Sequence, residues 1–406
     1  MDTPGVPVIR GTNMGKGRFV SGDFAFVSES KAADLSSNVA LPGDLVFTQR
    51  GTLGQVALVP DGPFAKYIVS QSQMKITVDT AVADRLYLFY LFSSAEQQHY
   101  IRQNAIQTGV PHTNLGILKK TPVLLPPPSE QRAIAGVLGA LDDKIELNRR
   151  MNRTLEATAR ALFQSWFVDF DPVHANAAGA PTLPPDLAAL FPAEFDSFEI
   201  GDVPKGWEVS TFDRVAAFER DTVKPMEAAE ETFDHYSLPA FDAGRMPQHD
   251  LGGTIKSNKY AVPPDAVLIS RLNPRIPRVW MPNLGDQRRS ICSTEFLVAR
   301  PRPKMSREWL YGLLTSDRFQ RRYQSMVTGT TGSHQRVKAK SLPTLPQLIP
   351  PPSIVEVFTR YVAPMYARIS ANGDQSRTLA ALRDALLPKL LSGDLSVAAV
   401  QRAVDA

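Results

Sequence analysis

The sequence predicts an α/β protein (α+β) built from two repeated domains and two long helices that pack together as a coiled coil. Short segments of the first half recur in the same order in the second half. In each half, short β-type runs precede an apolar helical stretch. Each half ends in a run of prolines followed by a heptad pattern. The length of 406 residues, at roughly 100–200 residues per domain, suits two or three domains.

The repeat rests on five matches whose offset stays between 220 and 224 residues. Each match is weak by itself. Five in the same order favour a duplicated unit with small loop insertions over the alternative, a chance similarity of strand–turn patterns. The matched pairs are residues 41–46 with 262–267, 69–74 with 291–296, 91–94 with 313–316, 108–109 with 328–329, and 126–129 with 350–353.

Each copy predicts the same order of elements. β-type runs with turn signals come first, as in residues 44–48. Apolar helical stretches follow at residues 86–92 and 309–314, and then a polar loop that begins with Thr-Gly. Pro-Pro-Pro-Ser ends the globular part, where Ser129 or Ser353 can cap the next helix.

The segments after the two proline runs predict long helices that pack on each other. Residues spaced alternately by four and three follow the heptad pattern of a coiled-coil seam. Asn148 and Asn372 occupy matching positions, and an Asn in a seam usually fixes register and partner. The alternative is that each helix packs only on its own domain. Pro364 and Pro388 predict kinks or interruptions in the second helix. The predicted seam consists of Ile134, Leu138, Leu141, Ile145, Asn148, Asn152, Leu155, Leu162 and Trp166, and of Phe358, Val362, Met365, Ile369, Asn372, Leu379, Leu386 and Leu390.

Composition sets the expected boundaries. Small residues and prolines between the copies predict a flexible linker. The expected parts are a first domain at 1–125, a first long helix at 126–170, a linker at 171–204, a second domain at 205–349, a second long helix at 350–396 and a C-terminal tail at 397–406.

Several function classes find no support in the sequence. A single cysteine, Cys292, excludes an internal disulfide and a thiolate metal cluster, and it fits a reducing cytoplasm. No apolar run reaches the ~18 residues of a membrane span, and the first residues lack the features of a signal peptide. Residues 11–17 are too short for a phosphate-binding GxxxxGK[ST] loop, and the histidines lack metal-ligand spacing. We therefore expect no catalytic residue and no metal site.

Basic loops are the strongest functional signal. The net charge is only +4, yet residues 256–304 hold ten Lys or Arg against three acids. Lys and Arg neutralise phosphates, and Arg, Asn, Gln, Ser and Thr can read base edges. The alternative is a merely solvated surface. The candidate DNA contacts are Arg10, Asn13, Lys16, Arg18, Arg50, Lys66, Thr108, Gly109, His112 and Asn114 in the first copy, and Lys256, Lys259, Arg271, Asn273, Arg275, Arg278, Arg288, Arg289, Thr328, Gly329, Ser333, His334, Gln335, Arg336 and Lys338 in the second.

The helical regions resemble those of the specificity subunit of type I restriction–modification systems. The resemblance is carried by LLPPPSEQRAIA at residues 124–135, LDDKIELNRR at 141–150 and LFQSWFVDF at 162–170. In the second copy, ALLPKLLSG at 385–393 looks like the C-terminal helix of that family. The resemblance covers nearly the whole chain and is specific in the helices but weak in the domains.

The resemblance implies two target-recognition domains with twisted β-sheets at the ends of an antiparallel helix pair. Each domain would read one half of a bipartite double-stranded DNA site through the major groove. The helices would set the spacer and dock two modification (methyltransferase) subunits, and restriction (motor-nuclease) subunits would complete the complex. S-adenosylmethionine, ATP and Mg²⁺ would bind to those partners, so this chain would be non-catalytic, cytoplasmic and without a membrane partner.

Two departures qualify the resemblance. The second copy begins at Trp207, about 30 residues before residues 237–241, whereas the first copy begins near the equivalent of that later point. Either the start is truncated or misassigned, or the first domain is N-terminally short. In both cases we expect the first half-site to be read weakly or not at all. At the second junction, residues 354–356 replace the Glu-Gln-Arg of residues 130–132. The alternative function is a stand-alone DNA-binding or coiled-coil scaffold protein without enzyme partners.

Overall fold

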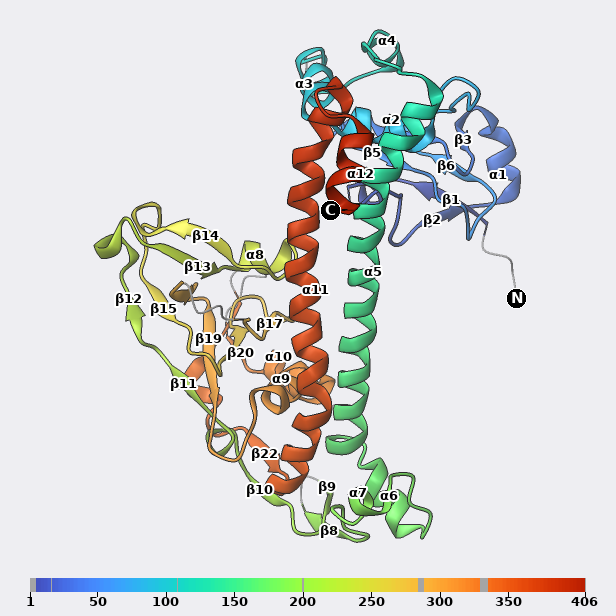
Figure 1. Ribbon diagram of the computed structural model, residues 1–406. Coiled ribbons are helices and arrows are strands. Elements are labelled where there is room, and N and C mark those ends of the chain that lie inside the picture. The colour runs from blue at the N-terminus through green and yellow to red at the C-terminus, as the bar shows by residue number, and fades with distance from the viewer. Residues whose placement is uncertain are drawn as a thin grey trace. The chain divides into compact units, whose positions relative to one another are not determined.

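The computed structural model describes residues 5–15, 17–107, 109–198, 201–283, 288–328 and 335–405, without the side chains of residues 328, 401 and 403–405. The chain divides into two compact units. Unit 1 comprises Met1–Arg149 with Gly373–Ala406, and unit 2 comprises Arg150–Asn372. Both long helices, α5 (Pro128–Phe167) and α11 (Pro352–Ser392), contribute to each unit (Figure 1).

Unit 1 holds two small sheets and a pair of short helices. The first sheet has the order β2-β1-β6-β3, in which only β1 and β6 run parallel. The second has the order β5-β4-β7 and is antiparallel. The elements are β1 (Val6–Ile9), β2 (Ala25–Val27), α1 (Glu29–Asp34), β3 (Val39–Ala40), β4 (Leu45–Thr48), β5 (Val56–Leu58), β6 (Tyr67–Val69), β7 (Gln73–Ile76), α2 (Arg85–Ser93), α3 (Ala95–Gln103), α4 (Leu115–Lys119) and, from the C-terminus, α12 (Val397–Asp405).

Unit 2 repeats this plan with additional strands. Its sheets have the orders β12-β15-β18-β13-β14 and β11-β19-β16-β17, with β10 on β22, β8 on β9 and β20 on β21 as separate pairs. The elements are α6 (Asp171–Ala177), α7 (Pro185–Ala188), β8 (Phe195–Phe198), β9 (Gly201–Pro204), β10 (Glu208–Thr211), β11 (Ala216–Glu219), β12 (Thr222–Val223), β13 (Thr232–Tyr236), α8 (Leu238–Asp242), β14 (Gln248–Leu251), β15 (Lys259–Ala261), β16 (Val267–Ser270), β17 (Val279–Trp280), β18 (Ser290–Cys292), β19 (Phe296–Pro301), α9 (Arg307–Thr315), α10 (Asp317–Ser325), β20 (Val327–Thr328), β21 (Arg336–Val337) and β22 (Pro346–Ile349).

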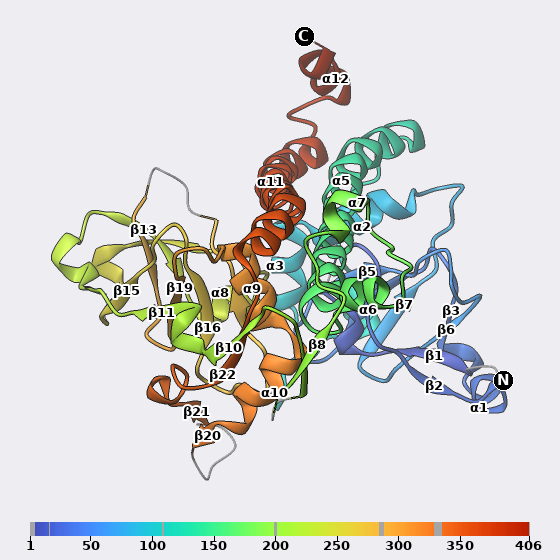
Figure 2. The same cartoon turned by 90° about the horizontal axis from the view of Figure 1, so that it is seen from below.

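The predicted repeat is confirmed. Strands β14-β13-β18-β15 have the same order and relative directions as β2-β1-β6-β3, and β17-β16-β19 match β5-β4-β7. The short helices begin alike, because Asp84 and Ser306 cap α2 and α9, while Ser94 and Ser316 cap α3 and α10. Figure 2 shows α9 and α10 beside the strands of the second domain, where α9 contacts β16 and β19.

The long helices pack on each other in an antiparallel arrangement, as the heptad pattern predicts. In unit 1, the buried Asn148 donates from Nδ2 to Gln375 Oε1 at 2.9 Å. In unit 2, the buried Asn372 donates from Nδ2 to Asn152 Oδ1 at 2.8 Å, and Asn152 donates to the carbonyl of Ile369 at 3.2 Å. Because each amide binds the facing helix, these contacts fix the register.

The seam residues also fill the domain cores, so helix–helix and helix–domain packing occur together. In unit 1, Ile134 and Leu138 of α5 join Leu390 of α11 in the cluster that buries α2. In unit 2, Trp166 of α5 packs edge-on against Phe358 of α11, with ring centroids 6.1 Å apart.

The predicted interruption of the second helix is wrong. Helix α11 runs without a break through Pro364 and Pro388. A proline removes one backbone donor and clashes with the preceding turn. The buried side chains of Val362 and Leu390 lie next to the two prolines and hold the helix in place there.

The segment 171–204 is folded where a flexible linker was expected. Helices α6 and α7 bury Val173 and Leu187 in the core of unit 2 together with Phe191. The amide of Asn176 donates to the carbonyls of Ala188 and Phe191, both at 2.9 Å. Apolar residues scattered between the prolines therefore decide the structure of this segment.

The expected C-terminal tail forms α12, which repeats α6. Val397 and Val400 pack against the core of unit 1, as α6 packs in unit 2. A left-handed residue reverses the chain after each long helix, Phe170 with φ 56° and Gly393 with φ 81°. In the described part of the chain, no helix has the length and apolar character to cross a membrane.

Candidate nucleic-acid interface

Three loops of unit 2 meet at a carboxylate held between two arginines. Arg271 follows β16, Glu295 precedes β19 and Arg336 begins β21. Glu295 accepts two hydrogen bonds from Arg336, at 2.9 and 3.1 Å, and one from Arg271 Nε at 3.3 Å. We call these three residues the Glu295 cluster. It carries one net positive charge and stays partly exposed, which suits contact with a polyanion.

Backbone hydrogen bonds fix the loops that carry the cluster. The amide of Val337 donates to the carbonyl of Arg271 at 3.0 Å, and the amide of Asn273 donates to the carbonyl of Gln335 at 2.9 Å. Asn273 has a left-handed backbone with φ 48°, which turns the chain toward the exposed Arg275. The two arginines therefore project from a rigid support.

The cluster also shifts the ionisation of its members. Hydrogen bonding and charge from Arg336, with help from Arg271, hold the pKa of Glu295 below its ordinary value despite partial burial. The carboxylate in turn raises the pKa of Arg336. Both shifts favour the charged forms of Glu295 and Arg336.

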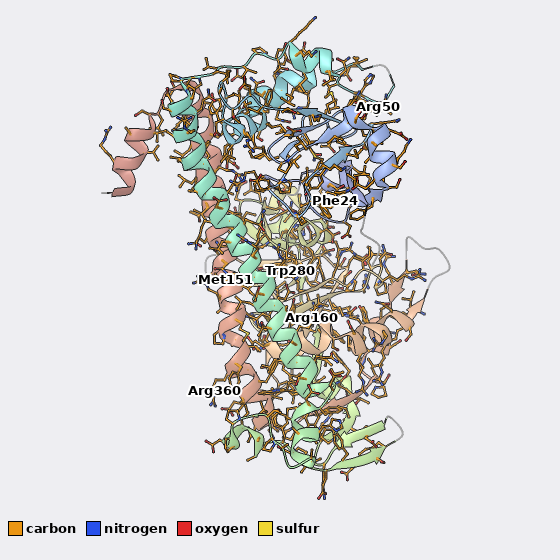
Figure 3. All side chains as sticks on the ribbon, turned by 90° about the vertical axis from the view of Figure 1, so that its right-hand side faces the viewer. Phe24, Arg50, Met151, Arg160, Trp280 and Arg360 are labelled. Carbon is orange, nitrogen blue, oxygen red and sulfur yellow. The ribbon has the colours of Figure 1, made fainter. Side chains whose placement is uncertain are left out.

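The first domain builds the same loop junction without a carboxylate or an arginine at the matching positions. The amide of Thr113 donates to the carbonyl of Gln49 at 3.0 Å, and that of Gln49 donates to Ser72 at 2.7 Å. By strand register, Gln49, Ser72 and His112 take the places of the Glu295 cluster. Arg50, which the sequence aligns with Arg271, lies one position further on, is exposed and has no ion pair among the described residues (Figure 3).

Many of the predicted basic residues are held by acids within the same unit. Arg278 binds Asp242 through two hydrogen bonds of 2.7 and 2.8 Å. Lysine and arginine side chains that are neutralised in this way present less charge to DNA. The other pairs are Arg18 with Asp143, Lys66 with Glu29 at 2.7 Å, Arg288 with Asp234 at 3.7 Å and Arg289 with Glu231 at 3.2 Å.

Three predicted contacts have structural roles in this conformation. Asn13 is fully buried, and its Nδ2 donates to the carbonyls of Ser21 and Asp23, so it shapes its own loop. Lys259 is buried and donates to Ser257 Oγ at 2.6 Å. Asn114 caps α4 by accepting from the amide of Ile117 at 2.9 Å.

The remaining predicted residues are exposed or lie outside the described part. Lys256, Arg275 and Lys338 are exposed and have no ion pair among the described residues, and Arg10 is exposed beside the carbonyl of Asp23. Gly109 is exposed with φ 74°. Lys16, Thr108, Gly329, Ser333 and His334 lie outside the described residues, as does the side chain of Thr328.

Sequence reasoning missed Glu295. It was counted only as one of three acids in a basic stretch. An acid that directly precedes an apolar strand, in a region so poor in acids, was the available signal. Only the fold shows that it faces two arginines from other loops.

Neither a metal site nor an accessible thiol is present in the described residues. They contain no cluster of three or more His, Cys, Asp or Glu able to hold a metal ion. The thiol of Cys292 is fully buried, and burial raises its pKa to about 12.

Comparisons with known proteins agree on one family. Residues 2–157 match the model of the type I restriction modification DNA specificity domain. The type I restriction enzyme MjaIX specificity subunit of Methanocaldococcus jannaschii is 26% identical over 380 residues, which cover 91% of this chain and 82% of that protein. The HindI specificity subunit of Haemophilus influenzae is 24% identical over 406 residues, covering 87% and 86%. The type I restriction–modification S subunit of M. genitalium shares the fold with a TM-score of 0.52 at 15% identity, covering 96% of this chain and 92% of that one.

The fold and the charged loop junction define a repeated α/β protein with paired long helices and a partly exposed cluster of one net positive charge. The resemblance predicted from the helical motifs is confirmed by the sequence matches along most of the chain. Over most of its length, the chain is therefore similar to specificity subunits of type I restriction–modification systems.

Proposed function

We propose that this chain reads DNA for a type I restriction–modification complex and leaves the chemistry to its partners. The observation that carries the proposal is the Glu295 cluster, a rigid junction of three loops that presents two arginines. Arginine pairs with guanine edges and with phosphates through its planar donors. The similarity to type I specificity subunits makes double-stranded DNA the proposed target of these donors.

Each domain, at 1–125 and 205–349, reads one half of a bipartite site in this proposal. The paired helices, at 126–170 and 350–396, set the distance between the half-sites and dock two modification subunits. Restriction subunits complete the complex, and S-adenosylmethionine, ATP and Mg²⁺ belong to the partners. The cytoplasm, where the host DNA lies, is the proposed location.

The two domains differ in the strength of their proposed DNA contacts. The second domain offers Arg271 and Arg336 on a charged junction, whereas the first offers Arg50 beside a neutral one. Electrostatic contacts dominate affinity for DNA, so the second half-site supplies the larger share of binding.

Mapping methylated adenines tests the proposal directly. The chain is co-expressed with the methyltransferase encoded beside it, and the host genome is sequenced for modified bases. A bipartite motif with a fixed gap is expected. A methyltransferase that works with another specificity chain but gives no motif with this one contradicts the proposal.

Two variants separate base reading from phosphate binding. Arg336→Ala is expected to relax the base preference at one position of the motif. The free-energy difference between the preferred base and the other bases there should fall by ~1–3 kcal/mol. Lys338→Ala is expected to weaken binding to all DNA sequences alike. It should also reduce the slope of log affinity against log salt concentration by about 1. Arg360→Ala, on the exposed face of α11 (Figure 3), is the matched control. It is expected to change neither the base preference nor the salt dependence of binding. If Arg336→Ala behaves like Arg360→Ala at every salt concentration, the cluster does not contact DNA.

Glu295 is proposed as a positioning residue for both arginines. Glu295→Gln releases them and adds one positive charge. Discrimination between sequences is expected to fall while non-specific binding rises, two changes that simple unfolding would not produce together. Asp242→Asn, which frees Arg278 in the same domain, is the control for added charge alone.

A further inference from the structure

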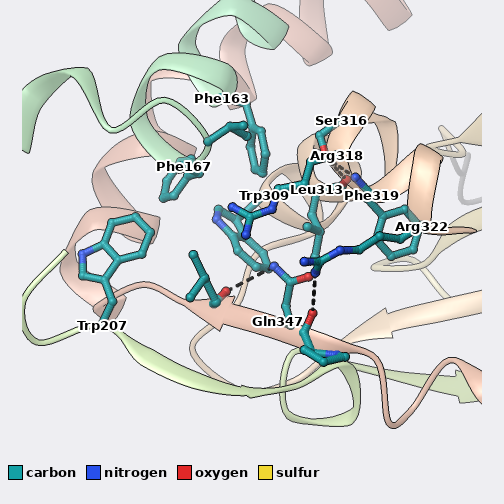
Figure 4. Close-up of a pocket in the computed structure, with 13 residues that line it drawn as sticks. Phe163, Phe167, Trp207, Trp309, Leu313, Ser316, Arg318, Phe319, Arg322 and Gln347 are labelled. Atoms are coloured by element: carbon teal, nitrogen blue, oxygen red, sulfur yellow. Dashed lines mark hydrogen bonds between the residues drawn. The ribbon is translucent and has the colours of Figure 1, made fainter. Parts of the chain in front are cut away.

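An aromatic pocket in unit 2 lies apart from the Glu295 cluster. Phe163 and Phe167 of α5 face Trp309 of α9 across it, with Phe167 and Trp309 ring centroids 6.1 Å apart (Figure 4). Helix α10 closes one side with two arginines. The remaining lining residues are Val168, Trp207, Leu313, Ser316, Phe319, Pro346, Gln347 and Leu348.

The two arginines of the pocket lack counter-ions. Arg318 and Arg322 lie one turn apart on α10, and neither forms an ion pair within the described residues. Arg322 donates to the carbonyl of Pro346 at 3.1 Å. No acidic side chain lines the pocket. Burial and then the charge of Arg322 lower the pKa of Arg318. Binding of a negatively charged group would therefore stabilise these two partly buried positive charges.

A buried donor adds to this imbalance. Trp309 is 1% exposed, and its Nε1–H finds no acceptor among the described residues. An indole N–H that is buried without an acceptor lowers stability until something accepts from it. The pocket wall thus offers hydrogen-bond donors and cations but no carboxylate.

The size of the space favours a small anion. The interior measures about 30 Å³. At roughly 10–15 Å³ for each water-sized group, it admits about two such groups, the number of oxygens in a carboxylate. The apolar walls suit the methylene stem that carries a carboxylate in a side chain. The phosphates of a duplex sit on a convex backbone without such a stem.

We propose that this pocket receives an acidic side chain of a modification subunit, with its carboxylate on Arg318 and Arg322. This proposal rests on the proposed function for the identity of the partner. Phe163 and Phe167 belong to the helix to which that function assigns the modification subunit. The first domain has no equivalent, because Glu96 and Tyr100 occupy the positions of Arg318 and Arg322 at the same distance from the helix caps. The pocket therefore makes the two docking places unequal.

The chemistry of the pocket is tested on the full chain with small probes. All four tryptophans lie in unit 2, so indole fluorescence reports binding there. Propanoate, which has the size and charge of a glutamate side chain, is expected to bind saturably, whereas its uncharged amide and inorganic phosphate bind at least tenfold more weakly. Equal binding of the amide, or tighter binding of phosphate, overturns the carboxylate assignment.

The variants assign the probe to the pocket. Arg318→Gln with Arg322→Gln is expected to weaken propanoate binding at least tenfold. Trp309→Phe keeps the wall and removes the N–H, and about a threefold loss is expected. Arg321→Gln, an exposed cation of the same helix outside this pocket, is expected to change nothing. Equal loss in Arg321→Gln overturns the assignment.

The docking role is tested with the purified modification subunit. The double variant is expected to bind it at least tenfold more weakly than wild type and Arg321→Gln do, with unchanged circular dichroism. Unchanged binding by the double variant overturns docking through this pocket. Failure of the wild-type chain to bind the subunit at all overturns the proposed function together with the docking, whereas the probe results still decide the chemistry of the pocket.

Discussion

The two domains have the same core but different edges. In unit 2, residues 207–236 add β11 beside β19, β12 beside β15 and β10 beside β22. In unit 1, the described residues add no strand beside β7 or β3. Residues 122–125, which precede α5 as β22 precedes α11, leave Leu124 64% exposed, whereas Leu348 of β22 is 7% exposed. The loop junction thus forms on the shared part, two small sheets and a helix pair, and the added strands of unit 2 extend the sheets at their edges.

The helix contacts of the two domains also differ at one matched position. In unit 1, Tyr90 of α2 donates to Asp142 of α5 at 2.6 Å, and Arg383 of α11 donates to the same carboxylate at 2.6 Å. In unit 2, the matching residue is Gly312, against which Phe163 packs. One domain thus uses a charged hydrogen-bond network where the other uses close apolar packing.

The largest effect is expected from the two residues that start the seam. Phe358→Ala in unit 2 should destabilise by ~3–5 kcal/mol, and Ile134→Ala in unit 1 by ~2–5 kcal/mol, because both are nearly unexposed. Hydrogen exchange resolved by peptide checks whether each loss stays in its own unit. A loss shared by both units would show that they unfold together.

The network of unit 1 is tested by removing one hydroxyl. Tyr90→Phe is expected to destabilise unit 1 by about 1.5–3 kcal/mol, the range for hydrogen bonds to charged groups. Tyr311→Phe is the matched control in unit 2, where the hydroxyl reaches Glu156 at a longer 3.1 Å, and a smaller loss is expected. Urea unfolding followed by circular dichroism and exchange measures both. Equal losses would mean that the shorter bond adds nothing.

The close packing of unit 2 is tested by one methyl group. In Gly312→Ala the new Cβ would lie 2.3 Å from Phe163 Cδ2. Overpacking destabilises by ~1–3 kcal/mol, whereas the higher helix propensity of Ala stabilises by ~1 kcal/mol. A net decrease of up to about 2 kcal/mol in the free energy of unfolding is therefore expected. Gly136→Ala on α5 meets nothing within 4 Å and should stabilise instead. Unfolding followed by tryptophan fluorescence measures the stability of Gly312→Ala. A gain in stability in this variant would contradict the close packing of Phe163 on Gly312.

The smallest effect is expected on the local stability of the loop junction at low pH. The pKa of Glu295 is lower in the folded chain than its ordinary value, so its contribution is complete above the unfolded value of ~4.3 and disappears as the pH falls through the folded value. Amide exchange at the loop junction of unit 2 should therefore accelerate in this range more than at the junction of unit 1, which has no carboxylate among Gln49, Ser72 and His112. The difference should vanish in Glu295→Gln, and its persistence would assign it to another group.

The heptad spacing was enough to predict both long helices, their pairing and the buried Asn148 and Asn372. The repeat offsets predicted which segments correspond. Burial by distant partners could not be predicted, which is why residues 171–204 and 397–405 were expected to be linker and tail. The acidic partners of the basic residues could not be predicted either, because a local count of charges does not show that Asp242 faces Arg278, or that Glu295 joins two loops. Asn13 shows the same limit, since its burial depends on the loop around it.

The antiparallel order of α5 and α11 has a consequence for synthesis. The core of the first domain needs Leu390, which the ribosome adds about 250 residues after Leu138. At ~5–20 residues per second, Ile134 and Leu138 wait roughly 10–50 s for their partner. The domain that emerges first is therefore completed last, and its apolar helix face is open to chaperones throughout that interval.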